Sequence, residues 1–120
     1  MKVLCICNHG NNRSAALARC FKDLDGPCLG TGEDYLKIYA KYEAIAVGAH
    51  HHSPETLQLL INWADVVFDA SDEPTKKHKV ALQAGNKYND IYPIIGYDSY
   101  GTPLSEDLLI KCRAIVEKLK

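Results

Sequence analysis

The sequence predicts an α/β fold in which helices cover both faces of a four-stranded parallel sheet. Short apolar segments alternate with segments of helical periodicity along the chain, and this alternation is typical of parallel sheets with right-handed crossovers. The chain has 120 residues and contains no repeat, linker or low-complexity tract. Its length predicts a single domain over residues 1–120 that is large enough to bury a core.

The first half of the chain contains two predicted strands and three predicted helices. In chain order these are residues 3–7 (strand), 14–23 (helix), 33–42 (helix), 44–47 (strand) and 53–63 (helix). Gly26 and Pro27 end the first helix. The last helix has the clearest start signal, because Ser53 can cap it, Pro54 fits its first position and Glu55 follows.

The second half of the chain contains two further strands and two further helices. In chain order these are residues 65–69 (strand), 72–84 (helix), 91–95 (strand) and 104–119 (helix). Pro93 interrupts the last strand, and proline is confined to edge strands, so we expect this strand at the side of the sheet. The final helix has the most regular apolar stripe of the chain, with Glu106 and Asp107 in its first turn.

Composition narrows the classes of function. The formal net charge of -1 gives no electrostatic reason to expect a nucleic acid polymer or a membrane as partner. The five cysteines are odd in number and include no C-x2-C pair, so we expect neither a disulfide framework nor a zinc site. The apolar run at residues 3–7 is too short for a signal peptide. These features favour a cytoplasmic monomer that needs no metal or cofactor.

Residues 7–14, the cysteine loop, are the functional centre of the sequence. Cys7 ends the first strand, five residues follow, and Arg13 and Ser14 open a helix. The backbone N–H groups of such a loop and the positive helix N-terminus can enclose a tetrahedral oxyanion such as phosphate. Arg13 can donate two hydrogen bonds to its oxygens, and the same field favours the thiolate of Cys7. The residues expected to surround the anion are Asn8, His9, Gly10, Asn11, Asn12 and Ser14.

The Cys-x5-Arg-Ser sequence after the first strand resembles the loop of the low-molecular-weight protein tyrosine phosphatases. The resemblance covers about the first twenty residues and residues 65–120. It implies a flavodoxin-like three-layer fold and hydrolysis of a phosphorylated protein or small molecule through a cysteinyl phosphate. Cys7 would be the nucleophile, and Ser14 would donate a hydrogen bond to its thiolate.

A general acid must protonate the leaving oxygen in such a reaction. The segment Asp98-Ser99-Tyr100 resembles the Asp-Pro-Tyr segment that carries the acid in this family, and it also precedes the last helix. The resemblance implies that Asp98 is the acid and that Tyr100 forms an aromatic wall of the site. Ser99 replaces the proline. Asp69 and Ser71, at the end of the third predicted strand, would lie at the rim, where Asp69 is expected to hold a loop.

Three departures from the family pattern affect the expected substrate. Gly10 stands where the family has an asparagine in a left-handed turn, and Asn12 replaces a second cysteine that could protect Cys7 in a disulfide. Asn11 replaces an apolar residue. The resulting polar mouth fits a phenyl ring poorly. Nucleotides and other small phosphate esters therefore remain possible substrates in addition to phosphotyrosine.

Other functions remain open on the sequence. Arsenate reduction would require further thiols, which the family places after the third strand, but no cysteine lies between Asp69 and Ile110. A IIB-type sugar-transport phosphocarrier also ends its first strand on a cysteine, and Gly10 and Ser14 partly fit its pattern. A phosphate-binding module without turnover is a fourth possibility. The run His50-His51-His52 is expected either to be solvated or to line the mouth of the site.

Overall fold

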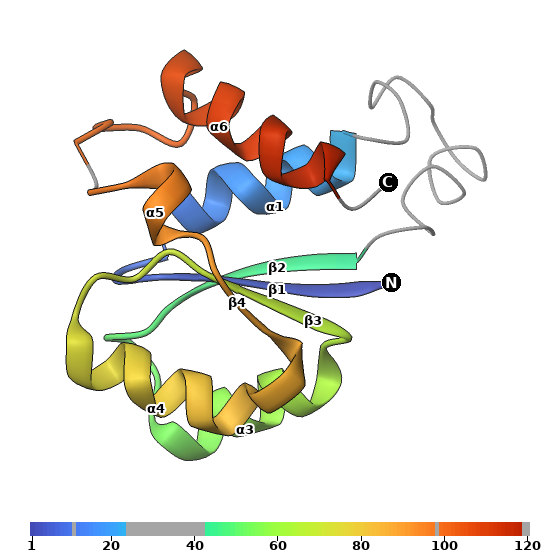
Figure 1. The fold of residues 1–120 in the computed structure, drawn as a ribbon, viewed down its shortest axis with the longest axis vertical. Helices are drawn as coiled ribbons and strands as arrows, with labels where there is room; N and C mark the ends of the chain where they lie inside the picture. The colour runs from blue at the N-terminus through green and yellow to red at the C-terminus, as the bar shows by residue number, and fades with distance from the viewer. Residues whose placement is uncertain (11, 24–42, 98, 119–120) are drawn as a thin grey trace.

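The computed structural model describes residues 1–10, 12–23, 43–97 and 99–118 (Figure 1). The helix predicted over residues 33–42 and the helix end predicted at Gly26 and Pro27 lie outside the described residues. Asn11 and Asp98 also lie outside them.

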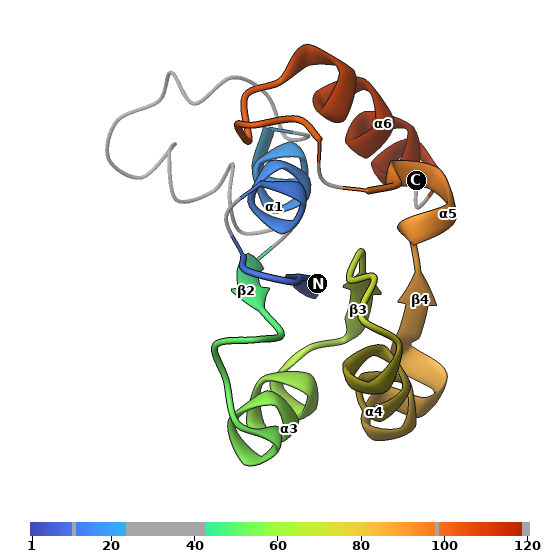
Figure 2. The ribbon, with the colours of Figure 1, turned by 90° about the vertical axis from the view of Figure 1, so that its left-hand side faces the viewer.

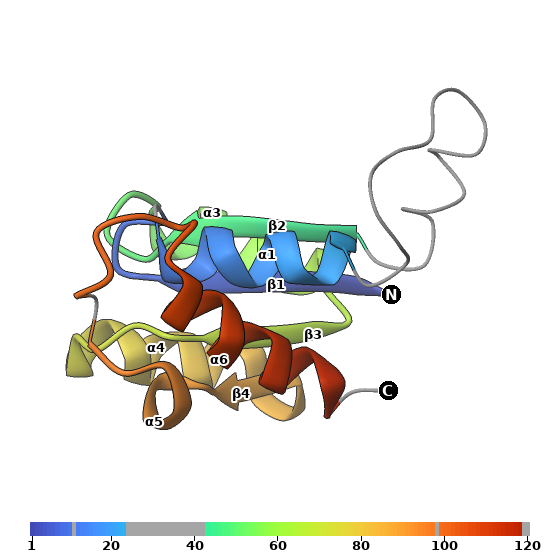
Figure 3. The same cartoon turned by 90° about the horizontal axis from the view of Figure 1, so that it is seen from above.

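The sheet contains four parallel strands, as the sequence predicts. They are β1 (Lys2–Cys7), β2 (Glu43–Gly48), β3 (Val66–Asp69) and β4 (Tyr88–Asp90). Their spatial order is β2-β1-β3-β4, which Figure 3 shows from one edge of the sheet to the other. The strand order therefore reverses between β1 and β3. In open α/β sheets, ligands bind outside the carboxyl ends of the strands at such a reversal.

β1 is central and buried on both faces, and its alternating side chains divide the core in two. Val3, Cys5 and Cys7 belong to one apolar cluster, whereas Leu4 and Ile6 belong to the other. The period of two in a strand places alternate residues on opposite faces of the sheet. Cys7 therefore ends β1 on the same face as Cys5.

Two sets of helices cover the two faces. The helices α1 (Arg13–Asp23), α5 (Tyr92–Ile95) and α6 (Glu106–Glu117) lie on the face of Cys5 and Cys7 (Figures 1 and 2). The opposite face is covered by α3 (Pro54–Trp63) and α4 (Pro74–Ala84). A parallel sheet with helices on both faces is the fold class that the alternation of segments predicts.

Local sequence accounts for where α3 and α4 begin. The side chain of Ser53 accepts a hydrogen bond from the backbone N–H of Thr56, and Pro54 occupies the first turn of α3. At α4, the carboxylate of Glu73 accepts from the backbone N–H groups of Thr75 and Lys76. Both starts agree with the expected signals.

Within the described part of the chain, the fourth strand is the element that the sequence misplaces. We expected it over residues 91–95, but β4 comprises Tyr88–Asp90, and Tyr92–Ile95 forms the short helix α5. The Asp90 carboxylate accepts a hydrogen bond from the N–H of Tyr92, and Pro93 lies in the first turn of α5, where no N–H is required. The expectation of an edge position is correct, because β4 pairs only with β3 among the described strands.

The carboxyl ends of β1, β2 and β3 meet at one edge of the sheet, so the loops that follow them lie together (Figure 3).

Across the described ranges, no helix combines the length and the apolar composition that would be needed to cross a membrane.

Candidate active site

Two polar groups lie within hydrogen-bond distance of the Cys7 sulfur at the end of β1. The backbone N–H of Gly10 donates to the Cys7 Sγ at 3.1 Å, and the Ser14 Oγ lies 3.1 Å from the same atom. Cys7 and Ser14 are both buried, with exposed fractions of 2% and 1%. Hydrogen bonds donated to a sulfur stabilise the thiolate relative to the thiol. The cysteine loop therefore curls back over its own cysteine.

Gly10 makes this curl possible. Its φ is +77°, in the left-handed region that favours glycine, as expected for a residue in the left-handed turn of the loop. A Cβ at Gly10 would also lie 2.7 Å from the backbone nitrogen of Gly48, at the end of β2. A Cβ at Gly48 would in turn lie 2.4 Å from the carbonyl carbon of His9. The loop and the end of β2 touch at two positions where only glycine fits.

Arg13 is the largest fully buried side chain, with an exposed fraction of 1%. Its Nη1 donates to the carbonyl oxygen of Ala70 at 2.7 Å and to that of Gly96 at 3.1 Å. Its Nε is buried and has no hydrogen-bond partner in the described part of the chain. An oxyanion in the cysteine loop is the kind of acceptor that would satisfy this donor. The two carbonyls hold Nη1 in place, and Nε stays available to donate to a ligand.

Asn8 ties the cysteine loop to the segment after β3. Its Nδ2 donates to the Asp72 carboxylate, and its Oδ1 accepts from the backbone N–H of Asp72 at 3.2 Å. Both polar ends of the Asn8 side chain are thus used inside the protein. The side chain of Asn8 thus braces the loop, and the expectation that Asn8 helps to surround the anion stays a prediction.

Asp69 holds the loop after β3, as expected. Its Oδ1 accepts from the N–H of Ser71 at 2.8 Å and from the Ser71 Oγ at 2.5 Å, and its Oδ2 accepts from the Tyr88 hydroxyl at 2.9 Å. Burial raises the pKa of Asp69, against the opposing effect of these hydrogen bonds. Both Asp69 and Ser71 are fully buried, so they support the loop from beneath and do not line a rim.

Three histidines meet beside the cysteine loop. The His9 Nδ1 lies 3.4 Å from the His51 Nε2, and the His9 ring centroid lies 5.1 Å from that of His50. The backbone joins the same segments, because the N–H of His50 donates to the Asn8 carbonyl at 3.0 Å. His9 and two members of the histidine run are therefore neighbours. The sequence offered a signal for this contact, since both segments follow adjacent parallel strands.

The remaining predicted residues divide into those that the structure describes and those that it does not. The carbonyl oxygen of Asn12 accepts from the N–H of Ala16 at 2.9 Å in the first turn of α1. Asn11 and the expected general acid Asp98 lie outside the described residues. Their assignments stay predictions.

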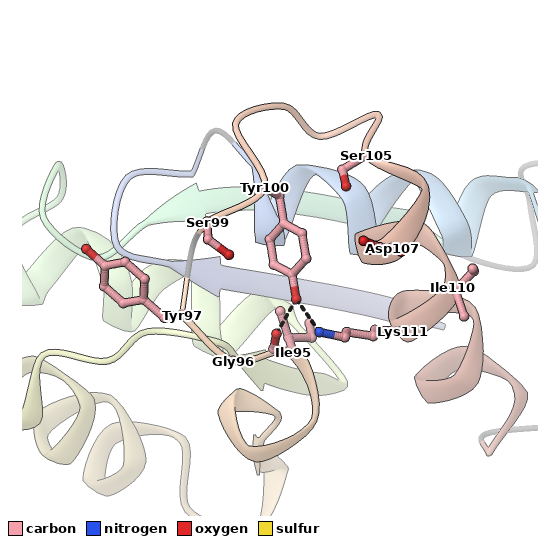
Figure 4. A pocket seen from close by; sticks show the side chains of 9 residues that line it. All are labelled: Ile95, Gly96, Tyr97, Ser99, Tyr100, Ser105, Asp107, Ile110 and Lys111. Atoms are coloured by element: carbon pink, nitrogen blue, oxygen red, sulfur yellow. Dashed lines mark hydrogen bonds between the residues drawn. The ribbon is translucent and has the colours of Figure 1, made fainter.

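Tyr100 lines an open cavity of about 670 Å³ between α5 and α6 (Figure 4). Its hydroxyl donates to the carbonyl of Ile95 and accepts from the Lys111 Nζ at 2.7 Å. These described hydrogen bonds run to α5 and α6 and not to the cysteine loop. The cavity nevertheless adjoins the site, because Gly96 lines it and also accepts a hydrogen bond from Arg13. Its lining residues are Ile95, Gly96, Tyr97, Ser99, Tyr100, Ser105, Asp107, Ile110 and Lys111.

The other described cysteines lie away from the loop. Cys5, Cys20 and Cys112 are buried in the apolar core on the α1 and α6 face. A hydrogen bond with Cys20 and burial raise the pKa of Cys112. The raised pKa makes Cys112 a poor nucleophile, and all three side chains pack in the core.

The strand order and the cysteine loop at its reversal point define an α/β protein with the fold of the low-molecular-weight phosphatases. The fold is shared with a solved structure of YwlE arginine phosphatase, a C7S mutant with a phosphorylated active-site serine. The TM-score is 0.53 at 14% sequence identity, and the match covers 99% of this chain and 95% of the other. Comparisons with protein-family models and with curated proteins find no match.

Proposed function

We propose that this protein is a cysteine-dependent phosphatase that hydrolyses a phosphate monoester through a cysteinyl phosphate. The observation that carries the proposal is the environment of one sulfur. The Gly10 N–H and the Ser14 hydroxyl converge on the Cys7 Sγ, and the buried Arg13 follows in the same loop. A thiolate beneath a ring of anion donors is arranged for attack on phosphorus.

In the proposed reaction, the Cys7 Sγ attacks phosphorus in line with the leaving oxygen. The N–H groups of the loop and Arg13 stabilise the negative charge on the three equatorial oxygens. Asp98 protonates the leaving oxygen as the P–O bond breaks. It then takes a proton from the water that attacks the cysteinyl phosphate, which releases inorganic phosphate and the thiolate. Ser14 stabilises that departing thiolate by its hydrogen bond.

The fold neighbour supports this chemistry. That protein is named an arginine phosphatase, and its active-site serine, in a mutant in which serine replaces a cysteine, carries a phosphoryl group. An active-site side chain in this fold can therefore hold a phosphoryl group covalently. The substrate class that we propose for the present chain is a phosphate ester on a protein or small molecule, and a phosphorylated guanidinium is the alternative to be compared with it.

Of the rival functions, arsenate reduction is the one on which the other cysteines bear. Arsenate reduction needs a second thiol that can reach a Cys7 adduct, but the other cysteines that the structure describes, Cys5, Cys20 and Cys112, are buried in the apolar interior. Cys28 lies outside the described residues. A phosphocysteine carrier and a phosphate-binding module without turnover would keep the same loop. They differ from a phosphatase in the fate of the phosphoryl group, which an experiment can measure.

The test is hydrolysis of p-nitrophenyl phosphate by the wild type, Cys7→Ser and Asp98→Asn. We expect no turnover by Cys7→Ser and a loss of about a hundredfold for Asp98→Asn, the usual contribution of a positioned acid. The matched control is Asp65→Asn, since Asp65 precedes β3 at the opposite edge of the sheet, where its carboxylate accepts from the Lys2 N–H. This control should keep the wild-type rate.

Equal turnover by the wild type and Cys7→Ser would contradict the proposed function. A stable phosphoprotein mass without phosphate release would favour the carrier instead. Phosphate binding without either result would favour the binding module.

A further inference from the structure

Beside the cysteine loop lies a group of exposed cationic or potentially cationic side chains that the proposed reaction does not use. We define the histidine cluster as His9, His50 and His51, whose ring centroids are 5.1 Å apart for His9 and His50 and 5.4 Å apart for His9 and His51. All three are exposed. Among the described residues, no group of three His, Cys, Asp or Glu side chains is arranged to hold a metal ion.

The backbone fixes this cluster next to the nucleophile. The N–H of Ala49 donates to the Cys7 carbonyl at 2.8 Å, and the N–H of His50 donates to the Asn8 carbonyl at 3.0 Å. His9 itself lies two residues after Cys7. The histidine cluster therefore borders the cysteine loop on the side of β2.

Lysines extend the positive surface away from the loop. The Lys76 Nζ lies 3.5 Å from the carbonyl of Ala49, in the segment that carries His50 and His51. Lys76, Lys79 and His52 line a small cavity of about 200 Å³ that also includes Ala49. The chain as a whole has a formal net charge of -1, so this concentration of cations is local.

The nearby carboxylates have other partners. Glu73 accepts hydrogen bonds from the N–H groups of Thr75 and Lys76, and Asp72 accepts from the Asn8 Nδ2. They reduce the positive field but leave the imidazole rings open to a ligand. The histidine cluster is thus suited to an anion.

We propose that the histidine cluster and Lys76 bind a second anionic group, a carboxylate or a second phosphate, on the substrate whose first phosphate enters the cysteine loop. This inference rests on the proposed function and specifies its substrate class. A monoester with a neutral leaving group would fill only the cysteine loop. A substrate with a second negative charge would also pair with the imidazolium rings.

This recognition depends on protonation. Partial burial lowers the pKa of His50 from its ordinary value of 6.5, Lys76 and His9 lower it further, Glu73 opposes them and His51 adds a small lowering effect. The free His50 ring is therefore harder to protonate than an ordinary imidazole, and a bound anion would favour its protonated form by linkage. The preference for a doubly anionic substrate should rise as the pH falls below about 6.5.

The kinetic experiment compares matched probes at pH 5.5 and 7.5. One pair is 4-carboxyphenyl phosphate and its methyl ester, and the other is a phosphotyrosine peptide with flanking glutamates and the same peptide with glutamines. We expect kcat/KM to favour the acidic member of at least one pair by about fivefold or more at pH 5.5, the upper end for an exposed ion pair. The pair that shows the preference identifies whether the substrate is small or a protein.

The double variant His50→Gln, His51→Gln should bring that ratio close to one. The control His78→Gln, on the exposed surface of α4, should keep the wild-type ratio. Hydrolysis of the acidic and the neutral member of each pair with equal kcat/KM would overturn the inference while leaving the proposed function intact.

A binding measurement keeps the inference testable if no probe is hydrolysed. Histidine ring resonances are followed by NMR during titration with 3-phosphonopropionate or with propylphosphonate, which lacks the carboxylate. We expect tighter binding of the carboxylate compound at pH 5.5, with shifts in the rings of His50 and His51, and loss of the difference in the double variant. Equal affinities with unshifted rings would refute the anion site.

Discussion

At the scale of single residues, the position of Arg13 depends on two main-chain carbonyls from distant parts of the chain. Ala70 follows β3 and Gly96 follows α5, and both accept from the same Nη1. A buried guanidinium needs several acceptors, and a fork of donors can serve two carbonyls together with the anion of the proposed reaction. This geometry explains why an arginine is required here.

Replacing Arg13 with lysine tests that requirement. The single ammonium of Arg13→Lys cannot occupy the positions of both Nη1 and Nε, so we expect kcat/KM for p-nitrophenyl phosphate to fall about a hundredfold to a thousandfold, as when one transition-state donor is removed. Steady-state kinetics measures the loss, and circular dichroism checks folding. Arg19→Lys, on the exposed side of α1, is the matched control and should change little. A fully active, folded Arg13→Lys would contradict the assigned role.

At the scale of elements, the cysteine loop takes its shape from the end of β2. Gly10 and Gly48 face each other, and a Cβ on either would overlap the backbone of the other segment. Backbone atoms cannot move aside as a flexible side chain can. The loop and β2 are therefore positioned as one unit.

The variant Gly48→Ala tests this unit. A Cβ 2.4 Å from the His9 carbonyl carbon would push the cysteine loop away, so we expect an unfolding free energy lower by about 1–3 kcal/mol, as for other overpacked sites, and little remaining activity. Urea denaturation and the phosphatase assay measure the two effects. Gly85→Ala is the control, because no atom lies within 4 Å of its Cβ position and only the strain of a positive φ is expected. Equal losses in both variants would argue against contact as the cause.

At the scale of the whole molecule, the buried Asp69 links pH to stability. Its carboxylate joins the end of β3 to Ser71 and to Tyr88 in β4, and burial raises its pKa above the ordinary value of 3.8. The native state therefore holds this proton more tightly than the unfolded chain. The associated stability is fully present below about pH 3.8 and is lost as the pH rises through the folded pKa.

The pH dependence of unfolding by urea measures this effect between pH 4 and 8. Relative to Asp69→Asn, the wild type should lose stability as the pH rises through that window, because the native state must then ionise a buried carboxyl group. Tyr88→Phe removes a hydrogen bond that favours the ionised form, so it should move the loss to higher pH. Parallel profiles for all three proteins would show that Asp69 does not control the dependence.

Much of this architecture could be predicted from the sequence because its signals are local. The helix starts at Ser53 and Glu73 and the apolar run of β1 depend on neighbouring residues alone. Prediction was wrong at β4, where the apolar residues 91–95 resemble a strand. The Asp90 carboxylate accepts from the N–H of Tyr92, Pro93 fits a helix start, and pairing with β3 uses the more polar residues Tyr88–Asp90 instead.

The sequence by itself determined the α/β class, the position of Cys7 at a strand end and the sequence of the loop that follows. Apolar periodicity and glycine chemistry act over a few residues, so they can be read along the chain. Only the tertiary structure decided which carbonyls hold Arg13, that Asn8 braces Asp72, and that His9 meets His50 and His51. Those contacts join residues more than forty positions apart, and they follow from the parallel register of β1, β2 and β3, which no local pattern encodes.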